Sequence, residues 1–381
     1  MRGVSEWAGA EVACACGRTH ACTIGEIRVG PGVLAGVAEA VRCRVRGGGA
    51  LVVADTRTRA ACGDRVERAL RLAGVPFAVC VVAGEPVVPN EAAVAAVRAT
   101  VRSDHTVLVA VGAGTITDLT RYTASLTGLP FVAVATAASM DGYASSVSPL
   151  IVGGRKVTHP AVQPAAVFAD TEVMAAAPPP LLAAGFGDIL GKETALADWR
   201  LAHAETGEYW CPFLDGLIRG VLGRCRDVAG AVPQRGEAAV AAVAEALVLS
   251  GVAISLAGNS RPASGAEHHL SHYWEMDALA RGRPHALHGQ QVGVAAPYVA
   301  ACYHALGLSG TRGIEVPSPG ALRQTLRQAG CETEPRRIGI TPALLVESLA
   351  RAYTVRDRYT VFTYARQRGL LEDLARRVAE E

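Results

Sequence analysis

Short apolar runs alternate with segments of helical periodicity as far as residue 169. Apolar runs of this length are typical of strands buried on both faces, and the segments near 57–73, 90–102 and 115–127 read as helices between them. Such an alternation predicts a parallel sheet covered by helices. The predicted strands are 51–54, 77–82, 107–111, 131–135 and 166–169.

The pattern changes after the proline triplet 178–180, where strand-like runs nearly disappear. Proline continues neither a helix nor a central strand, so the triplet marks a boundary. We predict an α/β domain over residues 1–177 and an all-helical domain over residues 178–381, with ligand sites in the cleft between them. The predicted helices of the second domain lie near 181–204, 212–229, 236–258, 263–280, 288–307, 318–330, 341–352 and 362–380.

Composition narrows the classes of protein to which this chain can belong. Half of its 381 residues are hydrophobic and 19% are charged, which is typical of a globular enzyme and excludes a disordered chain. The net charge of +2 and the lack of a long basic run argue against nucleic-acid binding. Glu6 and Glu11 interrupt the N-terminal segment, and no apolar stretch of about 18 residues free of charges and turn residues stands out. We expect a cytoplasmic protein with no signal peptide and no membrane span.

A Gly-Ala-Gly turn at 112–114 joins one apolar run to a predicted helix. Its glycines let backbone N–H groups approach a ligand closely, and the start of the following helix favours the negative charge of a pyrophosphate. Thr117 stands where the usual dinucleotide fingerprint has its third glycine, so the motif alone is weak and a plain tight turn is an equal alternative.

Two further polar sites follow apolar runs. The loop 136–143 is built from small and hydroxyl residues with one carboxylate, Asp141, and such loops at the carboxyl ends of strands are where α/β sheets bind ligands. Asp55, at the end of the first run, suits either a ribose hydroxyl or a helix N-cap.

Six of the ten histidines lie between residues 268 and 304, and they indicate a metal site. His268 and His272 are four residues apart and share one face of a predicted helix, which is a common way to build a metal centre. His288 follows on the next predicted helix, and Asp188 offers a carboxylate in an apolar, glycine-rich helical start. Taken singly, Asp188 suits an N-cap and each histidine suits a hydrogen-bonded core position.

These segments resemble the sn-glycerol-1-phosphate dehydrogenase family, which belongs to the larger group of iron-containing alcohol dehydrogenases and dehydroquinate synthase-like enzymes. The resemblance runs in the same order from about residue 23 to about residue 310. It implies an α/β nucleotide-binding domain followed by an all-helical domain that binds metal and substrate. The segments that carry it are 112–118, 136–143, 185–192, 260–272 and 287–289.

The resemblance also implies an activity and a metal site. Members of the family reduce dihydroxyacetone phosphate to sn-glycerol 1-phosphate with a nicotinamide cofactor, NAD or NADP, and one divalent metal. By matching motifs, the metal ligands are Asp188, His268 and His288, with zinc as the first choice and nickel as the second. His269 is the neighbour that could be confused with His268, and the four-residue spacing to His272 favours His268.

Several residues near these motifs are expected to act on the substrate. Asp141 is expected to hydrogen-bond a substrate hydroxyl or a metal-bound water, and His272 is expected to relay a proton. Lys192 and Arg261 are candidates for the substrate phosphate, with Lys156 as a weaker third. The residues expected to bind the cofactor are Asp55, Gly112, Ala113, Gly114, Thr115, Asp118, Thr136 and Ser139.

Other interpretations stay open at this point. A dehydroquinate synthase-like cyclase, which uses NAD transiently, would typically carry a glutamate metal ligand and a Gly-Gly-Gly loop, so Asp188 and Ala113 argue against it. A related dehydrogenase acting on a phosphonate or another polyol is compatible with the motifs, whereas a non-enzymatic scaffold would not need the complete ligand set. Asp55 would repel a 2′-phosphate and slightly favours NAD.

Two features are left without a role. Cys14, Cys16, His20 and Cys22 lie close together in the sequence, but their spacing matches no strong zinc pattern, so we expect an ordinary hairpin with a structural metal as the alternative. The apolar C-terminal helices also leave a homodimer open.

Overall fold

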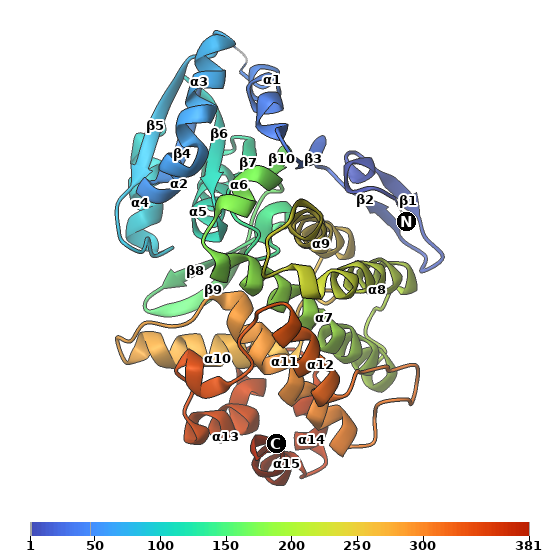
Figure 1. The fold of residues 1–381 in the computed structure, drawn as a ribbon. Coiled ribbons are helices and arrows are strands. Elements are labelled where there is room, and N and C mark those ends of the chain that lie inside the picture. Colours follow the sequence, from blue (N-terminus) through green and yellow to red (C-terminus); the bar gives the residue numbers. More distant parts are fainter. Residues whose placement is uncertain (1, 46, 381) are drawn as a thin grey trace.

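A computed structural model describes residues 2–45 and 47–380 of the chain. Its centre is a six-stranded parallel sheet with the strand order β3-β10-β7-β6-β4-β5 (Figure 1). All five strands predicted from the apolar runs are present. The strands of the sheet are β3 Glu26–Gly30, β4 Gly49–Asp55, β5 Phe77–Val82, β6 His105–Gly112, β7 Phe131–Ala135 and β10 Ala166–Asp170.

The central strands are apolar throughout because both faces of the sheet are covered. Along β6, Val107, Val109 and Val111 pack into one core with helices α1 (Val37–Arg42) and α3 (Asp64–Leu72). Leu108 and Ala110 point to the other face, where they pack with helices α4 (Glu91–Thr100) and α5 (Gly114–Thr127). The sheet is therefore the middle layer of an α/β sandwich, as the alternation predicted.

The sequence predicted neither the edge strand β3 nor the hairpin at 147–160, whereas the hairpin expected around Cys14, Cys16, His20 and Cys22 is present at 11–21. β3 is an edge strand that carries an ion pair between Glu26 and Arg28, so it lacks the apolar run of a central strand. Two antiparallel hairpins lie outside the sheet, and they are half exposed. Gly153 and Gly154 turn the second hairpin with positive φ angles of 55° and 74°. The hairpins are β1 Glu11–Ala13 with β2 Thr19–Ala21, and β8 Val147–Val152 with β9 Arg155–Pro160.

Helices make up the second half of the chain, below the sheet in Figure 1. The prediction of one helix over 362–380 is wrong, because Gly369 (φ 71°) divides the segment into two. The last sheet strand ends at Asp170 and the first long helix begins at Pro179, and we retain the division at 177/178 as a proposal. The helices are α7 Pro179–Thr206, α8 Pro212–Asp227, α9 Glu237–Ala257, α10 Ala266–Ala280, α11 His288–Ala305, α12 Pro319–Gln328, α13 Pro342–Arg351, α14 Val361–Gln367 and α15 Leu371–Ala379.

Short elements connect these layers. Two brief helices, α2 (Thr56–Thr58) and α6 (Thr171–Ala176), begin directly after β4 and β10. Single turns of 3-10 or π type are η1 Val4–Trp7, η2 Val33–Gly36, η3 Arg59–Gly63, η4 Gly142–Ala144, η5 Ala229–Ala231, η6 Pro335–Ile338 and η7 Ala352–Thr354.

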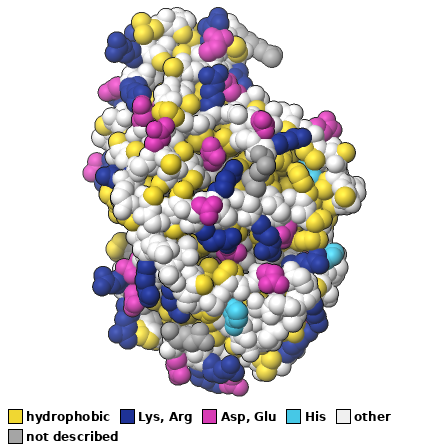
Figure 2. Space-filling model, turned by 45° about the vertical axis from the view of Figure 1, so that its right-hand side comes forward, with side chains coloured by type: hydrophobic (Ala, Val, Ile, Leu, Met, Phe, Trp, Pro, Cys, Tyr) yellow, Lys and Arg dark blue, Asp and Glu magenta, His cyan; other side chains and the backbone are white. Residues whose placement is uncertain are grey.

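One helix of the described chain, α9, is long and apolar enough to cross a membrane by length and composition alone. The sequence reading did not single it out. In the fold, 78% of its most apolar window is buried, so α9 packs as a core helix of the helical half. On the surface drawn in Figure 2, Lys and Arg side chains are interspersed with Asp and Glu, in keeping with the small net charge.

Candidate active site

Glycines bring helices α7 and α11 into backbone contact. A Cβ atom at Gly289 would lie 2.0 Å from the carbonyl oxygen of Ala184, and one at Gly187 would lie 2.6 Å from the carbonyl oxygen of Gly289. No larger residue fits at either position unless the helices separate. This contact sets Asp188, in the interior of α7, beside His288, the first residue of α11. The glycine-rich motif around Asp188 therefore serves helix packing, and the N-cap interpretation of Asp188 is wrong because α7 begins nine residues earlier, at Pro179.

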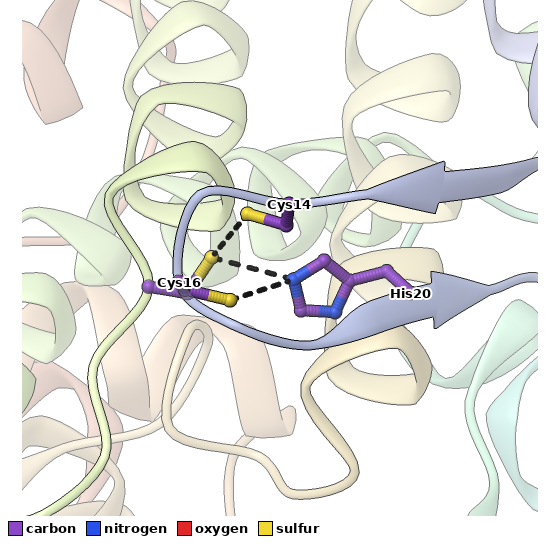
Figure 3. A group of neighbouring side chains, drawn as sticks. Cys14, Cys16 and His20 are labelled. Carbon is purple, nitrogen blue, oxygen red and sulfur yellow. Dashed lines mark hydrogen bonds between the residues drawn. The ribbon is translucent and has the colours of Figure 1, made fainter.

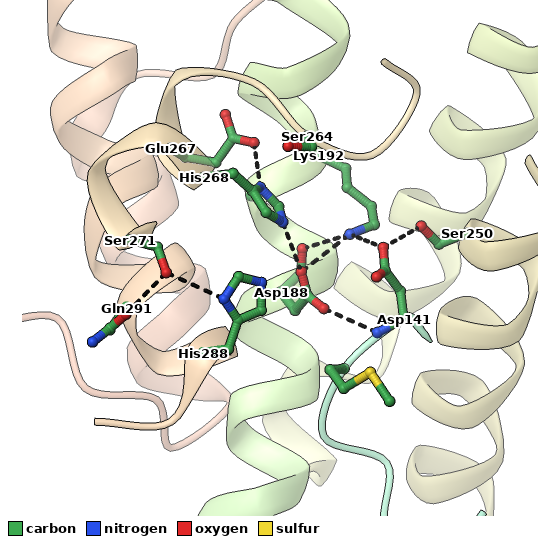
Figure 4. A network of polar contacts seen from close by, with 12 residues as sticks. Asp141, Asp188, Lys192, Ser250, Ser264, Glu267, His268, Ser271, His288 and Gln291 are labelled. Carbon is green, nitrogen blue, oxygen red and sulfur yellow. Dashed lines mark hydrogen bonds and ion pairs between the residues drawn. The ribbon is translucent and has the colours of Figure 1, made fainter. Parts of the chain in front are cut away.

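Asp188, His268 and His288 meet at one point between α7, α10 and α11 (Figure 4). One ligand atom from each side chain lies within 4.8 Å of the other two. His268 Nε2 is 3.6 Å from Asp188 Oδ1, and the two imidazole centroids are 5.1 Å apart. His269, the neighbouring histidine, is buried elsewhere and neither ring nitrogen has a hydrogen-bond partner among the described residues.

Hydrogen bonds orient both imidazoles toward this point. His268 Nδ1 lies 2.7 Å from Glu267 Oε1, and His288 Nδ1 lies 3.2 Å from Ser271 Oγ. Ser271 donates its hydroxyl proton to Gln291 Oε1, so its oxygen is free to accept from His288. Each Nδ1 therefore carries the proton and each Nε2 keeps a lone pair for a cation.

The electrostatics of these three side chains also fit a divalent cation. Burial lowers the pKa of His268 and of His288 well below the usual value, which keeps both imidazoles neutral, as metal ligands must be. Burial raises the pKa of Asp188 to about 7, because the ionised carboxylate has lost its hydration. A bound cation would stabilise the ionised form. Two imidazoles and a carboxylate suit zinc with one position left open.

Lys192 connects a second carboxylate, Asp141, to the group of Asp188, His268 and His288, which we call the metal trio. Its Nζ lies 2.9 Å from Asp141 Oδ2 and 3.2 Å from Asp188 Oδ1, and it donates to the Asp188 carbonyl oxygen at 3.0 Å. Burial lowers the pKa of Lys192, but the two carboxylates outweigh it, so the net shift is upward. Its three N–H donors are engaged, so we reassign Lys192 from phosphate binding to positioning of the carboxylates.

Asp141 contacts both Asp188 of the metal trio and Ser250 of helix α9. Its backbone N–H donates to Asp188 Oδ2 at 3.1 Å, and its Oδ2 accepts from Ser250 Oγ at 2.8 Å. Burial raises the pKa of Asp141, yet the adjacent Lys192 ammonium outweighs burial and lowers it overall. The carboxylate is therefore ionised and can accept a hydrogen bond from a ligand.

The carboxyl ends of β4 and β6 open into a cleft. These neighbouring strands lie where the strand order reverses, with β5 on one side and β7 on the other, which is the place where open α/β sheets bind ligands. Asp55, Ala113 and Thr115 line the cleft together with Gly84 and neighbouring residues. A Cβ atom at Gly112 would lie 2.4 Å from the Ile116 Cβ atom, so the turn requires glycine there.

Some residues predicted to bind the nucleotide instead make hydrogen bonds or ion pairs within the protein. The Asp55 carboxylate accepts from the Thr58 backbone at 2.7 Å, so the N-cap role is present, although Asp55 also faces the cleft. Thr117, which stands in place of the third fingerprint glycine, donates its hydroxyl proton to the carbonyl oxygen of Ala113, the N-cap of α5. Asp118 is buried and ion-paired with Arg121 at 2.6 Å, which in turn donates to backbone carbonyls of the segment after Asp141, so we reassign Asp118 to holding that segment.

The loop between β7 and η4 links the cleft to the metal trio. Thr136 donates its backbone N–H to the Gly112 carbonyl at 3.2 Å, and at the other end of the loop Asp141 donates to Asp188. Ser139 is half buried between them. A Cβ atom at Gly114 would lie 3.0 Å from Met140 Cε, so the two predicted ligand loops pack directly against each other.

The structure changes the choice of cations for a substrate phosphate. Arg261 donates to both carboxylate oxygens of Glu208 and to the Tyr359 carbonyl oxygen at 2.7 Å, so it is committed to internal contacts and we withdraw it as a phosphate ligand. Arg356 donates to His272 Nδ1 at 3.2 Å, and Lys156 Nζ lies 2.6 Å from Glu275 Oε2.

His272 lies beside the trio, with its ring centroid 6.4 Å from that of His268 and 5.7 Å from that of His288. Burial lowers its pKa well below the usual value, and the charges of Arg356 and Lys156 lower it further. The imidazole is therefore neutral with its proton on Nε2, because Nδ1 accepts from Arg356.

Sequence reasoning missed Glu267 and Arg356. Glu267 was detectable in principle, because it immediately precedes a proposed histidine ligand and such ligands usually donate to a carboxylate. Arg356 had no signal, since it lies in a segment without a motif, 84 residues beyond the His272 that it contacts.

Comparisons with known proteins agree with this architecture. Residues 28–178 match the family described as iron-containing alcohol dehydrogenase. The glycerol-1-phosphate dehydrogenase [NAD(P)+] of Geobacillus thermodenitrificans is 36% identical over 84% of this chain and 87% of its own. That of Methanosarcina mazei is 35% identical over 92% of this chain and 94% of its own. The structure of the iron-containing alcohol dehydrogenase from Corynebacterium glutamicum covers 97% of both chains with a TM-score of 0.72 at 18% identity. The chain therefore belongs to the glycerol-1-phosphate dehydrogenase family of NAD(P)-linked oxidoreductases, within the iron-containing alcohol dehydrogenases.

Proposed function

We propose that the protein reduces dihydroxyacetone phosphate, or a close phosphorylated ketone, to sn-glycerol 1-phosphate at the expense of NADH or NADPH. The observation that carries the proposal is the loop from Thr136 to Asp141. One end of it bonds to the Gly112 turn, where a dinucleotide would lie, and the other end bonds to Asp188 of the metal trio. A nicotinamide and a ketone held at these two places would be neighbours, as hydride transfer requires.

The two ligand sites have distinct donor sets. The proposed dinucleotide site comprises the turn at 112–115, the loop residues Thr136 and Ser139, and Asp55, whose charge disfavours a 2′-phosphate and so favours NAD. The proposed metal site comprises Asp188, His268 and His288, with zinc as the first candidate and nickel as the second.

The chain's own residues account for much of the chemistry around the ketone. A divalent cation at the trio supplies Lewis-acid polarisation of the ketone oxygen when it is bound. Lys192 keeps Asp141 ionised and fixed, so that this carboxylate can accept a hydrogen bond from the substrate hydroxyl. Glu267 and Ser271 hold the two imidazoles at fixed angles and leave little reorganisation for the reaction step.

Arg356 and Lys156 are the cations that we assign to the substrate phosphate. Arg356 contacts His272 directly, and the charges of Arg356 and Lys156 both lower the pKa of His272 beyond the effect of burial. Arginine binds phosphate in a bidentate manner, and a phosphate that drew Arg356 away would free His272 Nδ1 to take up a proton. His272 could then pass its Nε2 proton to the product oxygen and act as the relay.

A substitution tests this assignment. Arg356→Gln is expected to raise KM for the phosphorylated ketone roughly 10- to 100-fold, which corresponds to a charged hydrogen bond of ~1.5–3 kcal/mol. Arg261→Gln is the matched control, because the Arg261 guanidinium binds Glu208, whereas that of Arg356 binds His272. If both variants raise KM equally, or if neither does, the phosphate lies elsewhere.

The activity itself is tested with metal-reconstituted protein, dihydroxyacetone phosphate, and NADH or NADPH. We expect one cofactor oxidised per ketone reduced, and a loss of turnover in His268→Ala. Turnover only with a phosphonate or another polyol-derived ketone would indicate a paralogue with a changed pocket. A reaction without net cofactor consumption would indicate a cyclase related to dehydroquinate synthase.

The setting of the enzyme is part of the proposal. We infer a cytoplasmic enzyme that acts on a small phosphorylated ketone and binds no nucleic acid, in keeping with the mixed surface charge and the small net charge. A homodimer is compatible with the apolar C-terminal helices, and size-exclusion chromatography with light scattering would test it.

A further inference from the structure

A second cluster of side chains able to bind a metal lies outside the proposed active site. Cys14 and Cys16 stand in the turn of the β1–β2 hairpin, His20 lies on β2, and Cys211 directly precedes α8. In Figure 3, Cys14, Cys16 and His20 point toward one another at the turn of this hairpin. Cys22, which the sequence placed in the group, is buried outside it, and Cys211 takes the fourth place.

Three of the six ligand-to-ligand distances in this cluster are close to the edges of a tetrahedral site, and all four ligand atoms lie within 4.8 Å of one another. With metal–sulfur and metal–nitrogen bonds of about 2.3 and 2.05 Å, the edges of a zinc tetrahedron are about 3.8 Å between sulfurs and about 3.6 Å between sulfur and nitrogen. The Sγ atoms of Cys14 and Cys211 are 3.6 Å apart. His20 Nε2 lies 3.5 Å from Cys16 Sγ and 3.4 Å from Cys211 Sγ.

The surroundings prepare the four ligands for a cation. His20 is buried, and its Nδ1 donates to the Leu256 carbonyl oxygen at 2.8 Å, which leaves Nε2 with its lone pair facing the sulfurs. The Tyr209 hydroxyl lies 3.2 Å from Cys16 Sγ, where it can donate to a thiolate. The guanidinium of Arg18 lies over the Tyr209 ring and adds a positive charge nearby.

We propose that Cys14, Cys16, His20 and Cys211 bind a zinc ion that is structural and independent of the proposed activity. Four protein ligands fill the tetrahedron and leave no position for substrate, unlike the three of the active-site trio. On binding, the three thiols lose their protons to solvent and the imidazole stays neutral. The ion would fasten the N-terminal hairpin to the start of α8, and through His20 to the end of α9.

Metal content and cobalt spectroscopy test the proposal on the full-length protein. Zinc-grown wild-type protein should hold two zinc ions per chain, and Cys211→Ser and Asp188→Asn should each hold one. Cobalt-loaded wild type and Asp188→Asn should both show a sulfur-to-cobalt charge-transfer band, because the cysteine cluster offers thiolates and the Asp188 site offers none. Cys211→Ser should lack this band and melt at a lower temperature.

Cys22→Ala is the matched control, since it removes a buried thiol of the same segment that lies outside the cluster. It should keep both ions and the full charge-transfer band. The wild-type cobalt spectrum decides the matter even if the Cys211→Ser chain fails to fold. A cobalt-saturated wild type without the band would overturn the proposal. So would a wild-type chain as purified with one zinc ion and a Cys14–Cys211 disulfide by intact mass.

Discussion

Glu267 gives the sharpest test of how the proposed catalytic metal site is built. Its Oε1 accepts from His268 Nδ1 and from the Gly265 backbone, both at 2.7 Å, and its Oε2 accepts from Thr194 Oγ1 at 2.8 Å. Glu267→Gln keeps the shape and the acceptor for His268. The Thr194 hydroxyl also lies 2.9 Å from the Gly191 carbonyl oxygen, so it can donate there and accept from the new amide. The substitution therefore removes the charge and little else.

The size of the effect follows from the hydrogen bond. A charge-assisted bond contributes ~1.5–3 kcal/mol and a neutral one ~0.5–1.5 kcal/mol, so Glu267→Gln should cost ~1.4 kcal/mol, or about tenfold in metal affinity. Glu267→Ala leaves the His268 N–H unpaired and should approach 100-fold. Zinc affinity measured by chelator competition gives both numbers, with Asp277→Asn on the same helix, whose carboxylate pairs with the exposed Arg281 and Arg283, as a control expected to stay within about twofold.

Two results would refute this reasoning. The first is a Glu267→Gln affinity within about twofold of wild type, because the charge would then not act on His268. The second is a Glu267→Gln enzyme whose kcat stays low at saturating zinc, because the residue would then act on the reaction itself and not through the metal ligand.

Three further predictions concern the charges around both ligand sites. Lys192→Met should lower the unfolding free energy of the metal-free protein by about 3–5 kcal/mol, because two buried carboxylates lose their shared cation; a loss below ~1 kcal/mol in urea unfolding would contradict the ion-pair account. Asp55→Ser keeps an N-cap and should improve the NADPH-to-NADH affinity ratio about five- to tenfold, whereas an unchanged ratio would place the ribose elsewhere. Burial raises the Asp188 pKa from 3.8 to about 7, so protonated Asp188 stabilises the metal-free fold at low pH. This stabilisation falls as pH rises above 3.8 and is lost as pH rises through about 7. Over the same window, zinc affinity should rise about tenfold per pH unit and then level off, and calorimetry showing a flat profile below pH 7 would oppose this.

The sequence predicted the parts of the fold that burial dictates. The runs at 107–111 and 131–135 are apolar at every position because the sheet is covered on both faces, and that pattern needs no knowledge of neighbours. Edge strand β3 carries charges that water tolerates, so its pattern is not distinctive. The residue spacing likewise suggested that His268 and His272 share one helix face, and both lie near His288 in the fold.

Contacts between distant segments could not be predicted in this way. Cys211 reaches the cysteine cluster from 191 residues beyond His20, and Arg356 reaches His272 across 84 residues. Neither pairing produces a periodic pattern in the sequence, because each depends on how whole helices pack against one another. The N-cap interpretation of Asp188 failed for a local reason that was readable: proline favours the first turn of a helix, so the triplet at 178–180 signalled that α7 begins there.

The handedness of the product tests the central claim most directly. Dihydroxyacetone phosphate is prochiral, and hydride delivered from the Thr136–Asp141 side onto a ketone held at the trio should reach one face only. Chiral analysis of the product made by zinc-reconstituted enzyme with NADH should give sn-glycerol 1-phosphate alone, and none with His268→Ala. Formation of the 3-phosphate or of a racemate, or equal product from the variant, would contradict the account.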